Sequence, residues 1–339
     1  MSEIMRPVRL AANQPRQFYR GGAAIADLRG MPATAEFGPE DWVGSITTQF
    51  GKEAGLSPLP DGTLLRDAVA ADPTAWLGAA HAAEYGADTA LLVKLLDAGQ
   101  RLPVHYHPSD AFASDHLSCR HGKTEAWIVV GTSGPSPTVH IGFKADADPA
   151  VVDNWVTVQD RRAMLDALNA IPVKAGDTVF IPAGLPHAIG EGVFIVELQQ
   201  PTDFSITIEW EGFLDGPDSW HLGLGQATAL KALDMSGWDG KRLDTIVKHT
   251  ADNHDPIVDL LPSSEFFRAQ RLHADSPIEL DPSFAVLVVL DGEGRLHTEG
   301  GDPVALRRGD TFVLPHAAGS SKLDGGLVAV RCLPPEVPA

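Results

Sequence analysis

Residues 175–187 read AGDTVFIPAGLPH, and residues 308–320 read RGDTFVLPHAAGS. The two stretches align without a gap, and each has a Gly-Asp turn, a strand pattern that ends in proline, and a loop of small residues. The first copy ends on His187, whereas the second ends on Ser320. The repeat therefore predicts two related β-rich units, one with a functional site and one without.

The rest of the chain agrees with a mainly β fold. Short apolar runs bounded by Gly, Pro and Asp continue to about residue 211 and resume at about residue 265. This pattern is typical of sandwiches or barrels and not of a parallel α/β sheet. We expect a first unit at residues 1–211, a connecting segment at 212–264 and a second unit at 265–339.

Helical spacing of apolar residues interrupts the strands at three places. It predicts helices within residues 63–78, where Pro73 ends the pattern, and over residues 160–171 and 227–235. These short helices are expected between and around the two β units.

The composition limits the possible partners. The 339 residues carry a formal net charge of −19, so nucleic acid and anionic membranes are unsuitable partners. No apolar run approaches the about 20 residues that span a bilayer, and residues 1–14 lack the apolar core of a signal peptide. Because Cys119 and Cys332 form no metal-binding or redox spacing, these features together predict a cytoplasmic globular protein.

Two histidines one residue apart are the first candidate metal ligands. His105 and His107 stand at positions i and i+2, and such side chains of a strand point to one face about 6.6 Å apart. Glu125 opens the next predicted strand, and its carboxylate reaches the same space if the two strands pair. His187 arrives from the loop that follows Pro182. Three imidazoles and one carboxylate suit zinc first, with manganese, iron, cobalt and nickel as alternatives.

Several motifs resemble those of a known family. The spacings G-x5-H-x-H, from Gly99 to His107, and G-x5-P-x-G-x2-H, from Gly176 to His187, resemble the two signature motifs of the cupin superfamily. The stretches HPSDAFASDH and GKTEAW are similar to a pattern of class I mannose-6-phosphate isomerases, as are KLLDAGQRLPVHYHP and ELQQPTDFSITIEW. The resemblance is close over residues 88–210 and looser elsewhere.

This resemblance implies two cupin-like jelly-roll barrels, the second without metal, and a zinc enzyme that interconverts mannose 6-phosphate and fructose 6-phosphate. It implies that His105, His107, Glu125 and His187 hold the metal, with His105 standing where the family usually has glutamine. Lys123 of the GKTE motif matches a residue that serves substrate handling or proton transfer in the family.

Two positions depart from the family pattern. The family places an arginine ten residues after the glutamate of its Gln-Gln strand, here Glu197, and the matching residue is Thr207. A serine that helps to hold the substrate phosphate is replaced by Pro103. Phosphate is normally held by arginine, lysine or backbone amides. The departures therefore suggest that the sugar is unphosphorylated, or that its phosphate binds elsewhere.

The chemistry of such a site is proton transfer beside a carbonyl group. The proton leaves one carbon and returns to its neighbour through an enediolate, whose charge a divalent ion stabilises. Lys123 is the candidate base, or it donates a hydrogen bond while another group moves the proton. Glu197 is the second candidate; with Gln199, on its face of the strand, and Thr207 it completes the expected substrate-binding set.

Two other classes of protein share this set of ligands. A cupin dioxygenase would hold iron or manganese on the same four residues, and a sugar-binding protein would hold the sugar without turnover. In each case the expected partner is a small molecule. For an isomerase or a sugar-binding protein, this molecule is a sugar or a sugar phosphate. The sequence does not set the oligomeric state.

Overall fold

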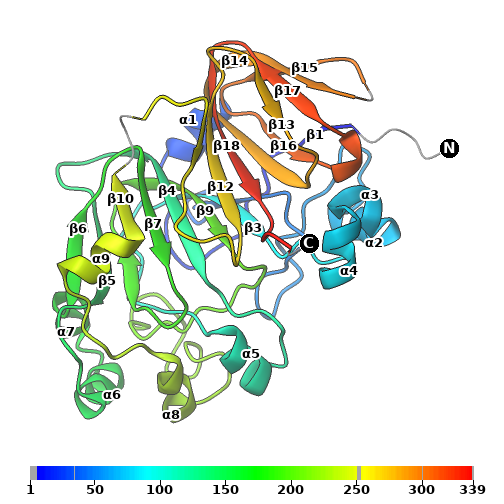
Figure 1. Cartoon of the computed structure of the whole chain (residues 1–339). Coiled ribbons are helices and arrows are strands. Elements are labelled where there is room, and N and C mark those ends of the chain that lie inside the picture. Colours follow the sequence, from blue (N-terminus) through cyan, green and yellow to red (C-terminus); the bar gives the residue numbers. More distant parts are fainter. Residues whose placement is uncertain (1–5, 34, 250–252, 300, 338–339) are drawn as a thin grey trace.

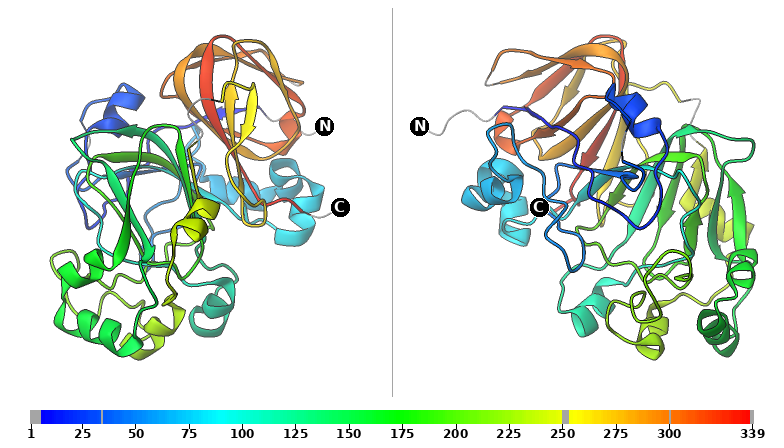
Figure 2. Two further views of the ribbon diagram at one scale, coloured as in Figure 1. Left: turned by 60° about the vertical axis from the view of Figure 1, so that its left-hand side comes forward. Right: turned by 180° about the vertical axis from the view of Figure 1, so that it is seen from behind.

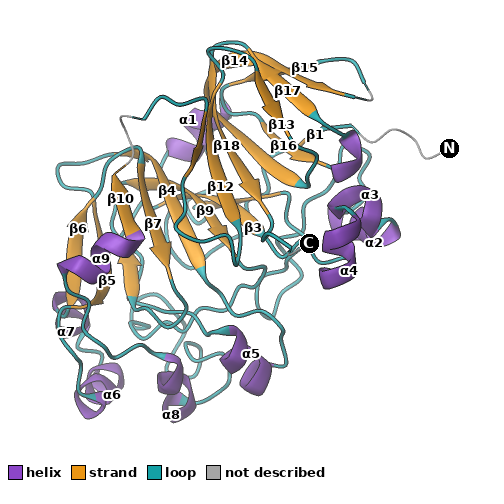
Figure 3. Ribbon diagram, in the orientation of Figure 1, coloured by secondary structure: helices purple, strands orange, loops and turns teal. Residues whose placement is uncertain are grey.

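The computed structural model describes residues 6–33, 35–249, 253–299 and 301–337. Antiparallel strands form two β-rich units, and the helices lie at their ends and sides (Figure 1, Figure 3). The prediction of a mainly β chain is confirmed. None of the described helices is long and apolar enough to cross a bilayer.

The first unit has a six-stranded sheet and a three-stranded sheet that share one apolar interior. In spatial order the six strands are β10 (Val247–His249), β7 (Asp177–Ile181), β4 (Glu125–Thr132), β9 (Val193–Gln199), β3 (Leu92–Asp97) and β2 (Glu40–Val43). The three strands are β6 (Leu168–Pro172), β5 (Thr138–Phe143) and β8 (His187–Ile189). Alternate residues of both sheets, such as Trp127 and Val129 of β4 and Ile141 of β5, pack in this interior.

The second unit is built on one large, branched antiparallel sheet. Its main path is β1 (Val8–Arg9), β16 (Thr311–Leu314), β14 (Ala285–Thr298), β18 (Leu327–Leu333), β12 (Arg268–His273) and β11 (Ile257–Asp259). The strands beside this path are β13 (Ile278–Leu280), β15 (Val304–Arg307) and β17 (Ser321–Asp324). The interior of this unit is filled by aliphatic side chains and Phe312.

The two units repeat one strand arrangement, as the sequence repeat predicts. The order β7-β4-β9-β3 in the first sheet corresponds to β16-β14-β18-β12 in the second. Both central strands carry an irregularity at the matching point, between Val129 and Gly131 in β4 and between Val289 and Asp291 in β14. Glu125 pairs with Ile181, and its counterpart Ala285 pairs with Leu314.

The outer faces of the two large sheets pack on each other. The shared cluster takes Ala126 and Val196 from the first sheet and Val288 and Val330 from the second, all of them buried. Figure 2 shows the second unit, orange to red, lying against the mostly green first unit. The strongly apolar contact joins the units into one body.

Segments from outside the β-rich stretches complete both sheets. Strand β1, near the N-terminus, pairs with β16 of the second unit. The segment 212–264 supplies β10 to the first sheet and β11 to the second. The division of the chain at residues 211 and 264 stays a prediction, and these pairings show that the N-terminal segment and the segment 212–264 supply edge strands to the sheets.

The helices are short. They are α1 (Ala24–Arg29), α2 (Leu65–Ala71), α3 (Pro73–Leu77), α4 (Ala79–Tyr85), α5 (Asp110–Leu117), α6 (Pro149–Val158), α7 (Arg161–Asp166), α8 (Gln226–Ala229) and α9 (Gly240–Ile246). Single turns of 3-10 helix lie at Leu230–Ala232 and His316–Ala318. Helices α1, α4, α5, α6 and α9 were not predicted from the sequence, although α6 begins at a proline and has Asp148 as its N-cap.

Two helix predictions need correction. The helix expected over 160–171 ends at Asp166, because residues 168–172 pair with β5 as strand β6. Tertiary pairing here overrides the local helical spacing. Pro73 does not simply end the helix within 63–78: it begins α3, and the Asp72 side chain accepts a hydrogen bond from the amide of Ala75 at 2.9 Å.

The contact between the units predicts a stability effect. Phe267 is fully buried in the shared cluster, and its ring centre lies 6.3 Å from that of Phe180 in the first unit. We expect Phe267→Ala to lower the free energy of unfolding by about 3–5 kcal/mol, measured by denaturant titration. The exposed Val158→Ala is the control and should change it by less than about 0.5 kcal/mol. An equal loss in both variants would contradict the proposed packing.

Candidate metal and substrate site

The first unit brings the three predicted histidine ligands together. His105 lies on an irregular segment that forms two isolated β-bridges. His105 pairs with His187 at the start of β8, and Tyr106 pairs with Ile206. Backbone hydrogen bonds of 3.0 and 2.8 Å tie His105 to His187 in both directions. His107 follows two residues later. The ligand nitrogens of the three buried imidazoles lie within 4.8 Å of one another.

Each imidazole is oriented by a hydrogen bond to a backbone carbonyl. The Nδ1 atom of His105 donates to Pro103 at 2.9 Å, that of His107 to Phe204 at 2.8 Å, and that of His187 to Leu185 at 2.8 Å. With Nδ1 protonated in a neutral ring, each Nε2 atom carries a lone pair that faces the shared space. This is the arrangement of histidines that bind a metal ion through Nε2.

The Glu125 carboxylate lies in the same space as the histidines, although its strand has other pairing partners than those considered from the sequence. Strand β4 does not pair with the His105–His107 segment; it pairs with β7 and β9. The carboxylate therefore enters from the six-stranded sheet, opposite the histidines. Its Oε2 lies 3.0 Å from His107 Nε2 and its Oε1 lies 3.2 Å from His187 Nε2, while the Trp127 indole donates to Oε1 at 3.0 Å.

The electrostatics of this group suit a cation. Burial, then the neighbouring histidines, hold the pKa of His105 well below its usual range, and burial with Lys123 lowers the pKa of His107 to about 3. Burial alone would raise the pKa of Glu125, but Lys123 and His107 lower it well below its usual range. Neutral imidazoles and an ionised carboxylate thus present only lone pairs to one another. Within the described chain, His187 Nε2 is buried without a hydrogen-bond partner, and Glu125 Oε2, which also has no hydrogen bond, has the ammonium of Lys123 as an ion-pair partner at 3.0 Å.

These residues fit a divalent metal ion. Three imidazole nitrogens and a carboxylate are ligands of the kind that zinc and similar borderline ions prefer. A cation between them would satisfy the lone pairs that the protein leaves unpaired, which would otherwise be costly in a buried site.

Lys123 lies directly beside the ligands, as the sequence predicts. Its ammonium is buried and lies 3.0 Å from Glu125 Oε2, 3.2 Å from His107 Nε2 and 3.9 Å from Glu197 Oε1. The lysine is fixed by the turn before β4, where its amide donates to the carbonyl of Pro108 at 2.9 Å.

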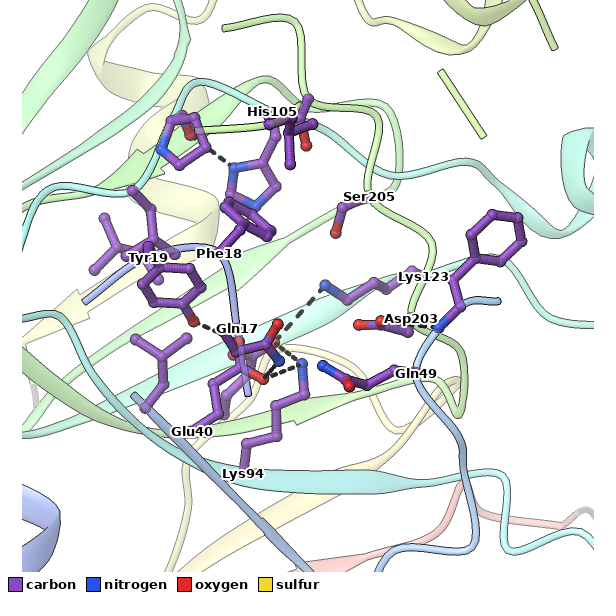
Figure 4. A pocket seen from close by; sticks show the side chains of 18 of the residues that line it. Gln17, Phe18, Tyr19, Glu40, Gln49, Lys94, His105, Lys123, Asp203 and Ser205 are labelled. Carbon is purple, nitrogen blue, oxygen red and sulfur yellow. Dashed lines mark hydrogen bonds and ion pairs between the residues drawn. The ribbon is translucent and has the colours of Figure 1, made fainter. Parts of the chain in front are cut away.

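The site opens into a cavity of about 260 Å³. His105, Lys123, Glu125 and Glu197 line it, and Figure 4 shows Lys123 pointing into it toward Glu40 and Lys94. A cavity of this size holds a small molecule such as a monosaccharide.

Two further charged residues on this cavity, Lys94 and Glu40, were not predicted from the sequence. Lys94 of β3 lies 3.4 Å from Glu40 and 3.9 Å from Glu197, and all three are buried. Glu40 also accepts hydrogen bonds from Tyr19, Trp42 and Gln17. Burial opposes the charge of Lys94, but Glu40 and Glu197 raise its pKa. The signal in the sequence was a lone lysine inside the apolar run 89–99, a position where an unpaired charge is unfavourable.

The remaining predicted residues lie in different surroundings. Glu197 and Thr207 line the cavity, and both are buried. Gln199 lies outside the cavity lining, and its amide donates to the backbone carbonyls of Gln200 and Thr202. Pro103 also lines the cavity, on the wall that includes Ser205 and Thr207.

The model of the "Mannose-6-phosphate isomerase, cupin domain" family matches residues 260–334, in the second unit. Three solved structures share the fold. A putative mannosephosphate isomerase from Archaeoglobus fulgidus matches with a TM-score of 0.77 at 20% identity, covering 99% of this chain and 100% of that one. The Bacillus subtilis mannose 6-phosphate isomerase matches with a TM-score of 0.74 at 22% identity, covering 97% and 99%. A mannose 6-phosphate isomerase bound with zinc and yttrium matches with a TM-score of 0.72 at 14% identity, covering 98% and 100%.

These matches confirm the cupin-type fold. The chain is also similar in sequence to curated proteins of the same kind. Mannose-6-phosphate isomerase ManA of Bacillus subtilis is 27% identical over 241 residues, which cover 69% of this chain and 72% of the relative. The mannose-6-phosphate isomerase of Streptococcus mutans is 30% identical over 253 residues, 70% of this chain and 72% of the relative. On this similarity, the chain belongs to the mannose-6-phosphate isomerase family.

Proposed function

We propose that this protein interconverts mannose 6-phosphate and fructose 6-phosphate as a metal-dependent isomerase, with zinc as the metal. The chain is an enzyme of an isomerase family, which disfavours the dioxygenase and the purely sugar-binding alternatives. The observation that carries the proposal is the convergence of three imidazole Nε2 atoms and the Glu125 carboxylate beside the buried ammonium of Lys123.

The proposed reaction needs stabilisation of negative charge on two adjacent sugar oxygens. A divalent ion held by His105, His107, Glu125 and His187 would supply Lewis-acid stabilisation of that charge. Lys123 lies next to the same space and donates hydrogen bonds or moves a proton there. Lys123, Glu125 and Glu197 are buried, which strengthens the electrostatic interactions at this end of the cavity.

Glu197 is the residue best suited to hold a proton in the cavity. Burial raises its pKa to about 8; Lys94 opposes the rise and Glu125 adds to it. At neutral pH the side chain is therefore protonated and lies 3.9 Å from the ammonium of Lys123. A carboxyl group in this state can donate a proton and take it back, as aldose–ketose isomerisation requires.

One observation favours a second candidate, the isomerisation of a sugar without phosphate. Pro103, Ser205 and Thr207 line the cavity and carry no charge, and the lining residue Asp203 beside them is acidic. Lys94 and Lys123 are already engaged by buried carboxylates. A comparison of mannose 6-phosphate with mannose as substrates separates the two candidates.

Metal removal tests the proposed function directly. We expect chelator-treated protein to lose isomerase activity and zinc-reloaded protein to regain it, measured by a coupled assay alongside metal analysis. His187→Ala should lower both the bound zinc and kcat, because it removes a ligand. His254→Ala, which changes an exposed histidine of the segment 212–264, is the control. Full activity of protein shown to hold no metal would contradict the proposal.

The role of Lys123 predicts a separation between catalysis and metal binding. Lys123→Met should lower kcat by about 10²–10⁴-fold, the usual contribution of a positioned proton-transfer group. The zinc content should remain that of the wild type, because Lys123 is not a ligand. The exposed Lys241→Met on α9 is the matched control. Unchanged kcat in Lys123→Met would exclude this role.

The raised pKa of Glu197 predicts a pH effect on stability. Between its model value of 4.5 and about 8, the folded protein keeps the Glu197 proton that the unfolded chain has lost. The contribution of this group to stability therefore falls as pH rises through that window and is level above it. Glu197→Gln has no such proton, so its unfolding free energy relative to wild type should rise between pH 5 and 8, measured by denaturant titration. A constant difference would contradict the raised pKa.

A further inference from the structure

A tight turn carries a lysine at the border of the substrate cavity. Residues Gln49, Phe50, Gly51 and Lys52 form this turn, in which the Lys52 amide donates to the carbonyl of Gln49 at 3.0 Å. Gly51 has a φ of +70°, which the third position of such a turn favours in glycine. Gln49, Phe50 and Lys52 all line the cavity, and Lys52 is exposed.

Contacts with residues 201–204 and with the ring of Trp42 hold the turn and the segments beside it in place. The amide of Phe50 donates to the Asp203 carboxylate at 3.1 Å, and its ring centre lies 5.6 Å from that of Phe204. The hydroxyl of Thr47 donates to the carbonyl of Pro201 at 3.3 Å. At the base, an added Cβ on Gly55 would lie 2.6 Å from the Trp42 ring, so the chain approaches that ring closely. These contacts fix where the lysine side chain begins.

Lys52 differs from the other two lysines of the cavity. Lys94 lies 3.4 Å from Glu40, and Lys123 lies 3.0 Å from Glu125. Within the described chain, no carboxylate lies within ion-pair distance of the Lys52 ammonium, although Glu53 is its neighbour in sequence. Among the described lining residues, none is an arginine. Lys52 is therefore the cation of this cavity whose charge remains available to a ligand.

We propose that Lys52 is a specificity-determining residue that contacts the phosphate group of a sugar phosphate bound in the cavity. The inference rests on the proposed function, since it assigns the phosphate end of that substrate. It also accounts for the neutral residue Thr207 and for Pro103, because the charge that recognises phosphate comes from the turn at residues 49–52 instead of from these two positions.

The physical reasons concern charge and solvent. A phosphate near neutral pH carries nearly two negative charges, and a protein of net charge −19 repels it at long range. A cation at the border of the cavity offsets this repulsion where the phosphate enters, without the desolvation of a further buried charge. Lysine serves as a point charge for phosphate in this way.

The test compares substrates with and without phosphate on the zinc-loaded full-length protein. Lys52→Met should raise KM for mannose 6-phosphate by about tenfold or more, the range of one hydrogen bond to a charged group. The KM for mannose, where turnover is measurable, should stay within about twofold. Lys52→Arg should keep KM for the phosphorylated sugar near the wild-type value, and Lys241→Met, which removes an equal charge elsewhere, should leave it unchanged.

Direct binding separates this inference from the proposed function. Calorimetric titration with mannose 6-phosphate should show about tenfold weaker binding by Lys52→Met, whether or not the protein turns the sugar over. Absence of turnover with this difference in binding would reject the proposed function and keep the role of Lys52. Equal affinity of Lys52→Met and wild type, or an equal loss for mannose and mannose 6-phosphate, would overturn the inference.

Discussion

Three hydrogen bonds from imidazole Nδ1 atoms to backbone carbonyls are the constraint on which the site depends. They turn the Nε2 atoms of His105, His107 and His187 toward one point, and they exist because the His105 segment pairs with the start of β8. Glu125 faces them from the opposite sheet. The ligand set is therefore a consequence of two sheets closing on one interior, and a shift of either sheet would separate its parts.

The charges beside the ligands form an alternating row. Glu40, Lys94, Glu197, Lys123 and Glu125 follow one another with separations of 3.4, 3.9, 3.9 and 3.0 Å. Each buried ion loses its hydration, which several kcal/mol of attraction must offset. Glu40 and Glu197 raise the pKa of Lys94 against the effect of burial, whereas burial raises the pKa of Glu197 to about 8 although two lysines lie beside it. Because both ammonium groups already have carboxylate partners in this row, they are less available to bind a substrate phosphate.

The sequence predicted the parts of the site that follow from local spacing. The His105–His107 doublet, the GKTE turn and the histidine after the Gly-Asp strand are short patterns with a direct geometric meaning. Lys94 and Glu40 were not predicted because their ion pair joins two strands that are far apart in sequence. In the sequence, neither residue differs from an ordinary charged residue. The partners of β4 were left open for a related reason, since spacing along the chain does not reveal which strands become neighbours.

The second unit shows what the same framework becomes without ligands. The gap-free repeat places Ser320, which is exposed, at the position of His187. Ala285, which is buried, stands at the position of Glu125. An apolar interior needs no cation and no compensating row of charges, so the interior of this unit contributes stability through packing. Its outer face then supports the back of the six-stranded sheet whose inner face carries Glu125, Lys94 and Glu197, which links the rigidity of the metal site to the contact between the two units.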